Sequence, residues 1–426
     1  MNEILIKGAR IVDPANHIDR TGDILIRDGK FAPLSEQSEN AQIINAEGLT
    51  AVPGLVDLHV HLRDPGQTYK EDIITGCKSA AAGGVTSLLA MPNTIPAVDT
   101  AETVEYILDK AKNADAHVYV VGAITKALKS EEPTDIEALR KAGISALSDD
   151  GCPVKNTVFM VEAMKKAAEL NIPVTAHCED PYLAGGKINE GEISEKLGVK
   201  GMPAAAEDAG TAREISLAQA YHVPIHICHV STATSYNMIR DAKKQGVKVT
   251  AETGPHYIML TQDELLKKDA DYRMNPPLRT EKDRQAMIKG LLDGTIDAIA
   301  TDHAPHSPED KSDFVNAPNG AIGMETSFAA SYTVLVKSGL MTISQLIEKM
   351  SVNPSKILHI NAGSLSVGTP ADMMLFDPNE EWTVDPEKLH GKSKNTPFKN
   401  LTLTSRVKMT ICGGKIVYGE ELLADR

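Results

Sequence analysis

The sequence predicts an α/β protein in which a (β/α)8 TIM barrel carries a small β-sandwich domain built from both chain termini. Three observations lead to this fold class. Eight short apolar runs alternate with helix-like segments in the middle of the chain, both ends contain strand-like runs, and polar residues able to bind a metal follow several apolar runs. Alternating strands and helices are typical of parallel α/β folds, and barrel enzymes gather such polar residues at one end of the strands.

The two ends of the chain are made of short apolar runs separated by turn residues. ILIKGARIV, DILIRDGKFAPL and QIINAEGL occupy the first fifty residues, where apolar residues show no helical spacing. ADMMLFDP and SRVKMTICGGKIVYGE follow the same pattern near the other end, and Gly413-Gly414 is expected to form a hairpin turn. We therefore expect residues 1–52, together with a linker and strands in residues 351–426, to form the β-sandwich.

Residues 53–350 are expected to form the metal-dependent barrel. The eight apolar runs are AVPGLVDLHVH, VTSLLAMPN, HVYVVGAI, GISALSDD, IPVTAHCED, VPIHICHVS, VKVTAETGPH and IDAIATDHAPH. Segments such as TVEYILDKAKNA and TVFMVEAMKKAAEL lie between them and repeat apolar residues at helical spacing. Eight such units over roughly 300 residues favour a TIM barrel. An open doubly wound sheet is the alternative, but no G-x-G-x-x-G follows the first run.

Composition narrows the class of function. The net charge of −14 argues against the basic surface that nucleic-acid binding requires. No apolar stretch approaches the roughly 20 residues needed to cross a bilayer, and the first residues lack a signal-peptide pattern. The five cysteines are odd in number and form no C-x-x-C pair. We expect a reducing, cytoplasmic protein with a small-molecule substrate and neither a nucleic-acid nor a membrane partner.

Polar residues capable of binding a metal lie at the C-terminal ends of five of the eight runs. The first run ends in His59-Val60-His61, and residues i and i+2 of a strand project to the same face. The other candidates are Asp149-Asp150, His177, His229 and Asp302. Four imidazoles and two carboxylates that converge from five strands suit a two-metal site for borderline ions such as zinc.

The remaining histidines and the cysteines near the candidate ligands are expected to be structural. His226 lies three residues before His229, so strand alternation points it to the other side. The same alternation turns Cys178 and Cys228 away from the ligand face, where they would serve as small buried apolar residues. The histidines expected to be structural or at the surface are His17, His117, His222, His359 and His390.

The string DLHVHLRDPGQTYKED around His59 resembles the signature of the amidohydrolase superfamily and, within it, the long bacterial class of dihydroorotases. Four further strings support the resemblance in order: MPNTIP, SDDGCPV, TAHCED and ATDHAPH. Together these strings cover nearly the whole expected barrel. The β-rich ends resemble the accessory sandwich domain of the same superfamily.

The resemblance implies a zinc centre with one or two ions. His59, His61 and Asp302 would hold one ion, and His177 and His229 would hold the other. Asp150 would bridge them, since the matching motif places the ligand second of the two aspartates.

Hydantoinases and allantoinases, which are relatives, use a carboxylated lysine as the bridge. No lysine ends the fourth run here, because Lys155 follows the turn.

The family's reaction is the reversible cyclisation of N-carbamoyl-L-aspartate to L-dihydroorotate in pyrimidine biosynthesis. The resemblance implies that a metal-activated hydroxide attacks the ring carbonyl, with Asp302 as general base and then acid. Arg63 would hold the substrate carboxylate bidentately. The substrate-binding positions implied by the resemblance are His61, Arg63, Asn93, Asn275, His306, Asn319 and Gly320.

The chain departs from the family pattern in two places. Asn319 stands where the family usually has phenylalanine, at a site where backbone amides are expected to contact the ring. The string Glu252-Thr253-Gly254-Pro255-His256 follows the family only loosely, and His256 is expected at most to support a ligand.

Two alternatives to an active dihydroorotase stay open at this stage. One is another cyclic-amide hydrolase, such as an allantoinase or a dihydropyrimidinase, against which Arg63 and the missing bridging lysine argue. The other is an inactive scaffold for aspartate transcarbamoylase, although such a protein should have lost its metal ligands. For the active enzyme we expect a homodimer, with association with aspartate transcarbamoylase as a further partner to consider.

Overall fold

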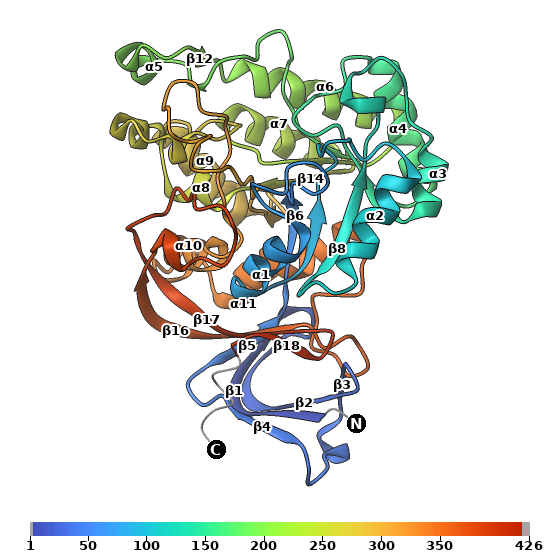
Figure 1. The fold of residues 1–426 in the computed structure, drawn as a ribbon, viewed down its shortest axis with the longest axis vertical. Coiled ribbons are helices and arrows are strands. Elements are labelled where there is room, and N and C mark those ends of the chain that lie inside the picture. Colours follow the sequence, from blue (N-terminus) through green and yellow to red (C-terminus); the bar gives the residue numbers. More distant parts are fainter. Residues whose placement is uncertain (1–2, 420–426) are drawn as a thin grey trace.

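The computed structural model describes residues 3–419, which form a barrel standing on a smaller sheet (Figure 1). The sheet contains strands from both ends of the chain, in the order β18-β17-β16-β5-β1-β2-β3, with β4 paired to β1. Its strands are β1 (Glu3–Asp13), β2 (Ile18–Arg27), β3 (Lys30–Ala32), β4 (Gln42–Asn45), β5 (Thr50–Pro53), β16 (Met373–Thr383), β17 (Thr402–Cys412) and β18 (Lys415–Tyr418). β5 and β16 pair antiparallel and thereby join the two ends.

Eight parallel strands form the barrel, and all eight fall within the apolar runs read from the sequence. They are β6 (Leu55–Val60), β7 (Val85–Ala90), β8 (His117–Gly122), β9 (Ile144–Leu147), β10 (Thr175–Ala176), β13 (Ile225–Ile227), β14 (Val249–Thr253) and β15 (Ala298–Ile299). Two four-stranded groups, β6 to β9 and β10 to β15, are joined by the parallel bridges Leu147–Val174 and Val60–His303. These bridges close the barrel.

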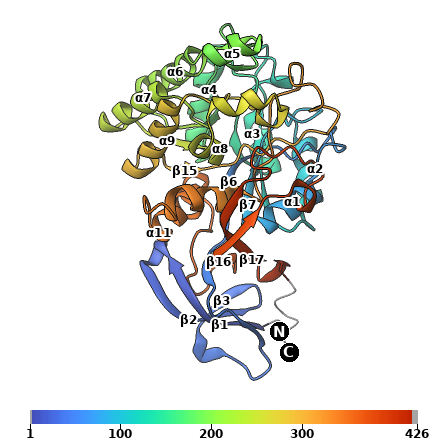
Figure 2. The same ribbon diagram turned by 90° about the vertical axis from the view of Figure 1, so that its left-hand side faces the viewer.

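Helices follow the strands and surround the barrel (Figure 2). The main helices that lie between the barrel strands or follow the last one are α1 (Ile73–Ala82), α2 (Ala101–Ala111), α3 (Ile136–Ala142), α4 (Thr157–Glu169), α6 (Ala205–Tyr221), α7 (Ala233–Lys244), α9 (Glu281–Asp293) and α10 (Ser327–Ser331). Several begin at a side-chain cap directly after the strand's loop: Asp72 Oδ1 accepts from Thr75 N, and Thr232 Oγ1 accepts from Ser235 N. None of the helices between residues 3 and 419 is long and apolar enough to span a membrane.

Smaller elements occupy the longer connections. The loop after β10 carries β11 (Ile188–Asn189), α5 (Glu192–Leu197) and β12 (Gly201–Met202), and the loop after β14 carries α8 (Pro255–Met259). α11 (Ile343–Ile347) and α12 (Asn353–Leu358) lead from the barrel back to the sheet.

Strand alternation lets β16 contribute to two apolar cores. Met373 and Leu375 belong to the core inside the terminal sheet, whereas Met374 and Phe376 belong to the large core of the barrel. The barrel approaches β16 closely at Gly84, where an added Cβ would lie 2.0 Å from Met374 Sδ. The barrel and the sheet are therefore packed through shared side chains.

Candidate metal centre

The six ligand candidates converge at the C-terminal ends of the barrel strands. His59 lies on β6 and His61 directly after it, while the other four follow different strands: Asp150 follows β9, His177 follows β10, His229 follows β13 and Asp302 follows β15. All six side chains are buried. The barrel thus brings together residues that are separated by up to 243 positions in sequence.

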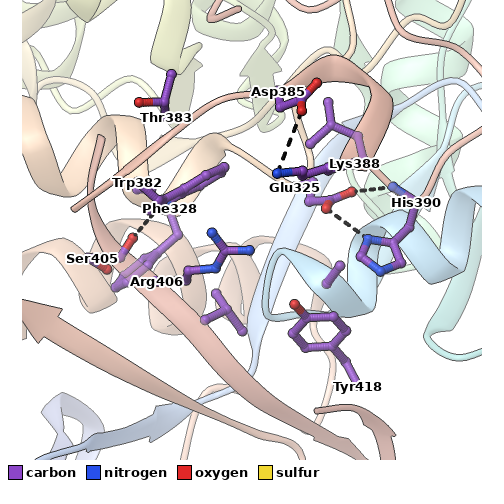
Figure 3. Close-up of a pocket in the computed structure, with 14 residues that line it drawn as sticks. Glu325, Phe328, Trp382, Thr383, Asp385, Lys388, His390, Ser405, Arg406 and Tyr418 are labelled. Atoms are coloured by element: carbon purple, nitrogen blue, oxygen red, sulfur yellow. Dashed lines mark hydrogen bonds and ion pairs between the residues drawn. The ribbon is translucent and has the colours of Figure 1, made fainter. Parts of the chain in front are cut away.

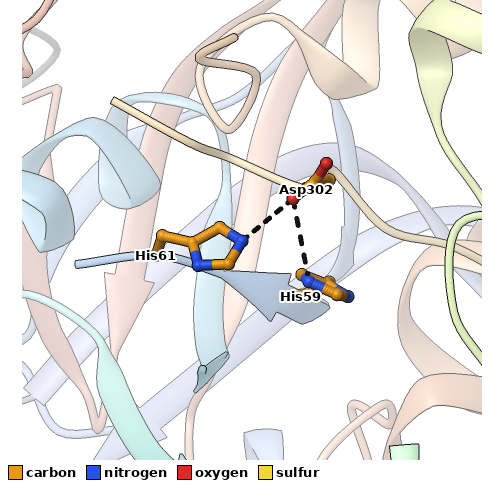
Figure 4. Close-up of side chains that lie close together, drawn as sticks. All are labelled: His59, His61 and Asp302. Atoms are coloured by element: carbon orange, nitrogen blue, oxygen red, sulfur yellow. Dashed lines mark hydrogen bonds and ion pairs between the residues drawn. The ribbon is translucent and has the colours of Figure 1, made fainter. Parts of the chain in front are cut away.

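His59, His61 and Asp302 form one half of this cluster (Figure 4). Asp302 Oδ1 lies 3.0 Å from His61 Nε2 and 3.7 Å from His59 Nε2. One ligand atom from each residue lies within 4.8 Å of the other two. Three donors at this spacing can surround a single cation.

His177 and His229 form the other half, and Asp150 lies between the halves. His177 Nδ1 and His229 Nε2 are 2.9 Å apart. Asp150 Oδ1 lies 3.2 Å from His59 Nε2, 3.5 Å from His177 Nδ1 and 3.8 Å from His229 Nε2. The second oxygen, Oδ2, lies 3.6 Å from His61 Nε2. The carboxylate of Asp150 therefore faces all four imidazoles.

Asp149 points to different partners from its neighbour. Its Oδ1 accepts hydrogen bonds from the backbone N–H groups of Ile124 and Thr125 at 2.7 and 3.1 Å, and Thr125 Oγ1 donates to Oδ2. Both oxygens of Asp149 are thus used to fix the loop after β8.

The charges in the centre stabilise one another. Burial acts against the charged form, but His59 and the nearby imidazoles of His177 and His229 hold the pKa of Asp150 well below its usual range. Burial likewise raises the pKa of Asp302, but the hydrogen bond from His61 and the charge of His59 lower it to about 2. Both carboxylates are therefore ionised at neutral pH.

The donor set suits a divalent metal ion. His59 Nε2, Asp150 Oδ1 and His177 Nε2 are buried without a hydrogen-bond partner, although buried polar atoms are normally paired. His177 Nδ1 and His229 Nε2 face each other, and at most one of two neutral rings can supply a proton there. Nitrogen and carboxylate donors of this kind are the ligands that borderline divalent ions prefer.

Glu252 supports the centre and was not among the predicted site residues. Its Oε1 lies 3.3 Å from His59 Nδ1, and its Oε2 lies 3.1 Å from His226 Nε2. Burial opposes ionisation, but the hydrogen bond from His226 and the nearby ring of His59 lower the pKa of Glu252 to about 2. A carboxylate behind a ligating imidazole fixes its ring and tautomer. The signal in the sequence was a carboxylate within the buried run VKVTAETGPH.

Cys228 lies closer to the centre than strand alternation predicted. Its Sγ lies within 4.8 Å of ligand atoms of His59 and Glu252, behind the His59 ring. Its thiol therefore lies beside the ring of a predicted ligand and beside the carboxylate that supports this ring. Cys178 is buried within the barrel core.

Asn93 connects the two halves of the cluster. His61 Nδ1 lies 2.8 Å from Asn93 Oδ1, an acceptor, so this nitrogen carries a proton, and the Nε2 of the same ring is directed at Asp302. Asn93 Nδ2 donates to Asp150 Oδ2 at 3.3 Å. The amide thereby orients one imidazole and one carboxylate together.

A cavity of about 300 Å³ opens above the cluster. All seven predicted substrate-binding residues line it: His61, Arg63, Asn93, Asn275, His306, Asn319 and Gly320. Asp150, His177, His229 and Asp302 also line the cavity, whereas His59 is fully buried and is absent from its lining. Lys187, which the sequence reading did not include, lies at the same cavity.

Arg63 is a buried cation at this cavity. Burial lowers the pKa of Arg63 to about 10, so the guanidinium stays charged at neutral pH. Its Nε donates to Pro305 O at 3.2 Å. Within residues 3–419 its two Nη groups make no hydrogen bond, which leaves both available to a ligand.

Asn319 has a partner that accounts for its departure from the family pattern. The fully buried Arg273 donates to Asn319 Oδ1 from Nε at 3.2 Å and from Nη2 at 2.9 Å. Gly320 N donates to Arg273 O at 2.9 Å. A phenylalanine at this position would leave Nε and Nη2 of the buried guanidinium without their acceptor, and only the bond from Nη1 to Phe314 O would remain.

Three residues at the cavity adopt a left-handed backbone conformation. The φ angles are 60° at Arg63, 34° at His229 and 48° at Asp302. This region is unfavourable for residues with a side chain, and such strain concentrates at functional sites. The three side chains are therefore aimed into the cavity at some cost in folding free energy.

A second hollow, of about 330 Å³, lies where α10 meets β17 (Figure 3). Its polar groups pair with one another: Arg406 stacks 4.8 Å from the Trp382 ring centroid, and His390 Nδ1 lies 2.9 Å from Glu325 Oε1. Among the described residues, the clusters able to bind a metal lie elsewhere. This hollow therefore contains no such cluster among residues 3–419.

Comparison with known proteins agrees with this geometry. The family described as "Dihydro-orotase-like" matches residues 48–235, and the family described as "Amidohydrolase family" matches residues 160–418. A protein named dihydroorotase from Acetivibrio thermocellus is 49% identical over 99% of this chain and 100% of its own length. Another of the same name, from Syntrophus aciditrophicus, is 46% identical over 98% of this chain and 100% of its own length.

Solved structures place the fold in the same group. An L-hydantoinase (dihydropyrimidinase) from Arthrobacter aurescens superposes with a TM-score of 0.87 at 25% identity, over 98% of this chain and 96% of the other. A structure described as a D-hydantoinase gives a TM-score of 0.85 at 25% identity, over 97% of this chain and 95% of the other. By its sequence relatives and its barrel, the chain belongs to the dihydroorotase family of the amidohydrolases.

Proposed function

We propose that the chain is an active dihydroorotase that interconverts L-dihydroorotate and N-carbamoyl-L-aspartate at a binuclear zinc centre. The observation that carries this proposal is a cluster of six metal-capable side chains beneath a cavity that the cationic Arg63 lines. The substrate contains both a cyclic amide to be hydrolysed and a carboxylate to be held. The cavity offers a group for each.

The metal ligands in this proposal are divided between two ions. His59, His61 and Asp302 would hold one ion, and His177 and His229 the other, with Asp150 between them. Bound divalent ions of this kind polarise a carbonyl group and lower the pKa of water. Zinc is favoured among them because imidazole and carboxylate are its usual ligands in hydrolases.

Asp302 is the group that moves the proton. Its carboxylate is ionised at neutral pH and lies at the cavity floor, so it can accept a proton from the attacking water. It then returns this proton to the nitrogen that leaves the carbonyl carbon when the ring opens. Ring closure uses the same steps in reverse, as reversibility requires.

The substrate is oriented by residues around the rim. Arg63 is placed to bind the exocyclic carboxylate with its free Nη groups. Asn275 Oδ1 is buried without a partner, while its Nδ2 donates to Glu179 Oε2 at 2.9 Å, so the oxygen can accept from a ring N–H. His306, whose pKa burial lowers to about 3, is neutral and can share a hydrogen bond.

A hydantoinase-like activity on neutral rings is the second candidate, because the similar solved structures carry that name. Two features of this chain favour dihydroorotate instead. The residues after β9 place Asp150, not a lysine, between the imidazoles. A charged guanidinium also lines the cavity, and a neutral ring offers it no partner.

An assay of three substrates with one variant tests the proposal. The purified protein should hydrolyse dihydroorotate in preference to dihydrouracil and allantoin. Arg63→Met should lower kcat/KM for dihydroorotate at least about tenfold, since a charge-assisted hydrogen bond contributes roughly 1.5–3 kcal/mol.

The same substitution should change any dihydrouracil activity far less. Arg20→Met, at an exposed position on β2, serves as the matched control and should leave both activities unchanged. An unaltered kcat/KM for dihydroorotate in Arg63→Met would reject the proposal that Arg63 binds the substrate carboxylate.

A further inference from the structure

A cluster of three metal-capable side chains lies at the opposite end of the barrel from the cavity. His117 is the first residue of β8, Asp372 precedes β16, and Cys412 ends β17. One ligand atom from each lies within 4.8 Å of the other two. The cluster therefore joins the barrel to both long strands of the terminal sheet that the second half of the chain supplies.

The contacts within the cluster hold the side chains in place. His117 Nε2 lies 3.1 Å from Asp372 Oδ1, which also accepts from Gly413 N at 2.6 Å. The thiol of Cys412 is buried and lies 3.6 Å from Thr86 O.

We propose that His117, Asp372 and Cys412 form a separate site for a thiophilic divalent cation, of which Zn²⁺ is the physiological type. A thiolate, an imidazole and a carboxylate are the three kinds of ligand that zinc takes, at about 2.0–2.3 Å. Tetrahedral ligand atoms are then roughly 3–4 Å apart, so small side-chain rotations complete the geometry. Mg²⁺ and Ca²⁺ prefer oxygen ligands and would be excluded.

The surroundings of the three side chains give the cation access from solvent, and water can act as its fourth ligand. The His117 side chain is 42% exposed, and an open cavity of about 600 Å³ is lined by His117, Cys412 and Gly413. Solvent can therefore reach the site and occupy the remaining coordination position. Binding releases the Cys412 proton, because the thiolate is the metal ligand.

Binding of the ion would stabilise the folded protein. The ion would connect residues of the barrel and the terminal sheet, and a ligand that binds only the folded state raises the unfolding temperature. The site is distant from the catalytic cavity and does not depend on the proposed function. Loss of the ion should therefore lower thermal stability without changing turnover.

Spectroscopy with Co²⁺ as the probe tests the site in the full-length protein with its catalytic metal in place. Adding Co²⁺ to the parent should produce a thiolate-to-cobalt charge-transfer band that saturates at one equivalent. Cys412→Ser should show no such band and should keep parental activity on dihydroorotate. His117→Gln keeps the thiol and should weaken Co²⁺ binding at least about tenfold, as loss of one ligand of three requires.

Cys228→Ser is the matched control, because Cys228 is the other thiol near metal-capable groups. It should retain the band. In the parent, Zn²⁺ should raise the unfolding temperature by a few degrees, and this rise should be absent in Cys412→Ser and His117→Gln. The proposal is overturned if the parent shows no band, if Cys412→Ser keeps it, or if Cys228→Ser loses it.

Discussion

Neighbouring residues of the same type take different roles in this chain because each finds different partners. Asp149 and Asp150 are both buried, yet Asp149 accepts from the loop after β8 and Asp150 faces four imidazoles. Sequence pattern alone could not separate them, since either aspartate could follow the strand. The family resemblance favoured Asp150, and the hydrogen bonds give that preference a physical reason.

Substitution of the two aspartates should have different effects on metal content and on stability. Asp150→Ala should lose metal on dialysis, because the group between the imidazoles is removed. Asp149→Ala should keep its metal but lower the free energy of unfolding by about 2–4 kcal/mol, since two backbone N–H groups lose their acceptor. Metal analysis and urea unfolding of both variants decide this. Equal metal loss would contradict the assignment of the bridge.

Asp302→Asn should abolish turnover while the barrel stays folded. The amide imitates the shape of the carboxylate but cannot carry the proton, and general acid–base catalysis contributes roughly 10²–10⁴-fold to a rate. Steady-state assays and circular dichroism measure the two properties. A variant that kept more than about a tenth of the parental rate would show that another group moves the proton.

Glu252 is a residue of the site that could not be predicted from the sequence. His59 and His61 could be predicted as metal ligands from their i, i+2 spacing at the end of a strand. Glu252 contacts the ring of His59 from a different strand, and no spacing in the sequence indicates this contact. Such a contact depends on the register between strands, which the sequence does not display.

At the scale of elements, the segment that carries Asn319 is fixed mainly by residues of an earlier loop. Arg273 donates to Asn319 Oδ1 and to Phe314 O, and Lys311 Nζ donates to Ala270 O, Arg273 O and Pro318 O. The loop between residues 307 and 320 is therefore held by the buried guanidinium of Arg273 and by the half-buried side chain of Lys311. This explains how an irregular segment can present Gly320 to the cavity in one position.

Weakening the contact between Arg273 and Asn319 should affect substrate binding more than the chemical step. Arg273→Lys and Asn319→Ala should each raise KM for dihydroorotate several-fold with a smaller change in kcat, because the loop lines the cavity but lies apart from Asp302. The double variant should be little worse than either single one, since both remove the same contact. Arg213→Lys, on α6, is the control. Additive effects would show that the two residues act separately.

The regular elements were more predictable than the connections between them. Each barrel strand lies within an apolar run, because burial on both faces demands a continuous apolar sequence. The insertion of β11, α5 and β12 after β10 was not predicted. Those elements are short and depend on contacts with distant segments, so their sequences carry no clear period.

At the scale of the molecule, the barrel and the terminal sheet share their packing. Phe376 on β16 is fully buried in the barrel core, and its neighbours Met373 and Leu375 lie in the core of the sheet. The sequence indicated that both ends form one β-rich unit. It could not indicate that β5 pairs with β16, since many pairings of short strands satisfy the same alternation.

The shared core predicts a single cooperative unfolding transition. Phe376→Ala should lower the free energy of unfolding by about 3–5 kcal/mol, and activity and ellipticity should be lost together on heating. Tyr182→Ala, at a position 87% exposed, should change stability by less than about 0.5 kcal/mol. Two separate transitions in the parent would contradict the coupling.

The pairing of β5 with β16 also bears on how the chain is made. The two strands are separated by more than three hundred residues, so a ribosome that adds about 5–20 residues per second needs on the order of 20–60 s to supply the partner. During that interval the apolar strands β1 to β5 lack the neighbour that completes their sheet. Unpaired apolar strands are templates for aggregation. The strands β1 to β5 therefore remain without this neighbour until β16 has been synthesised.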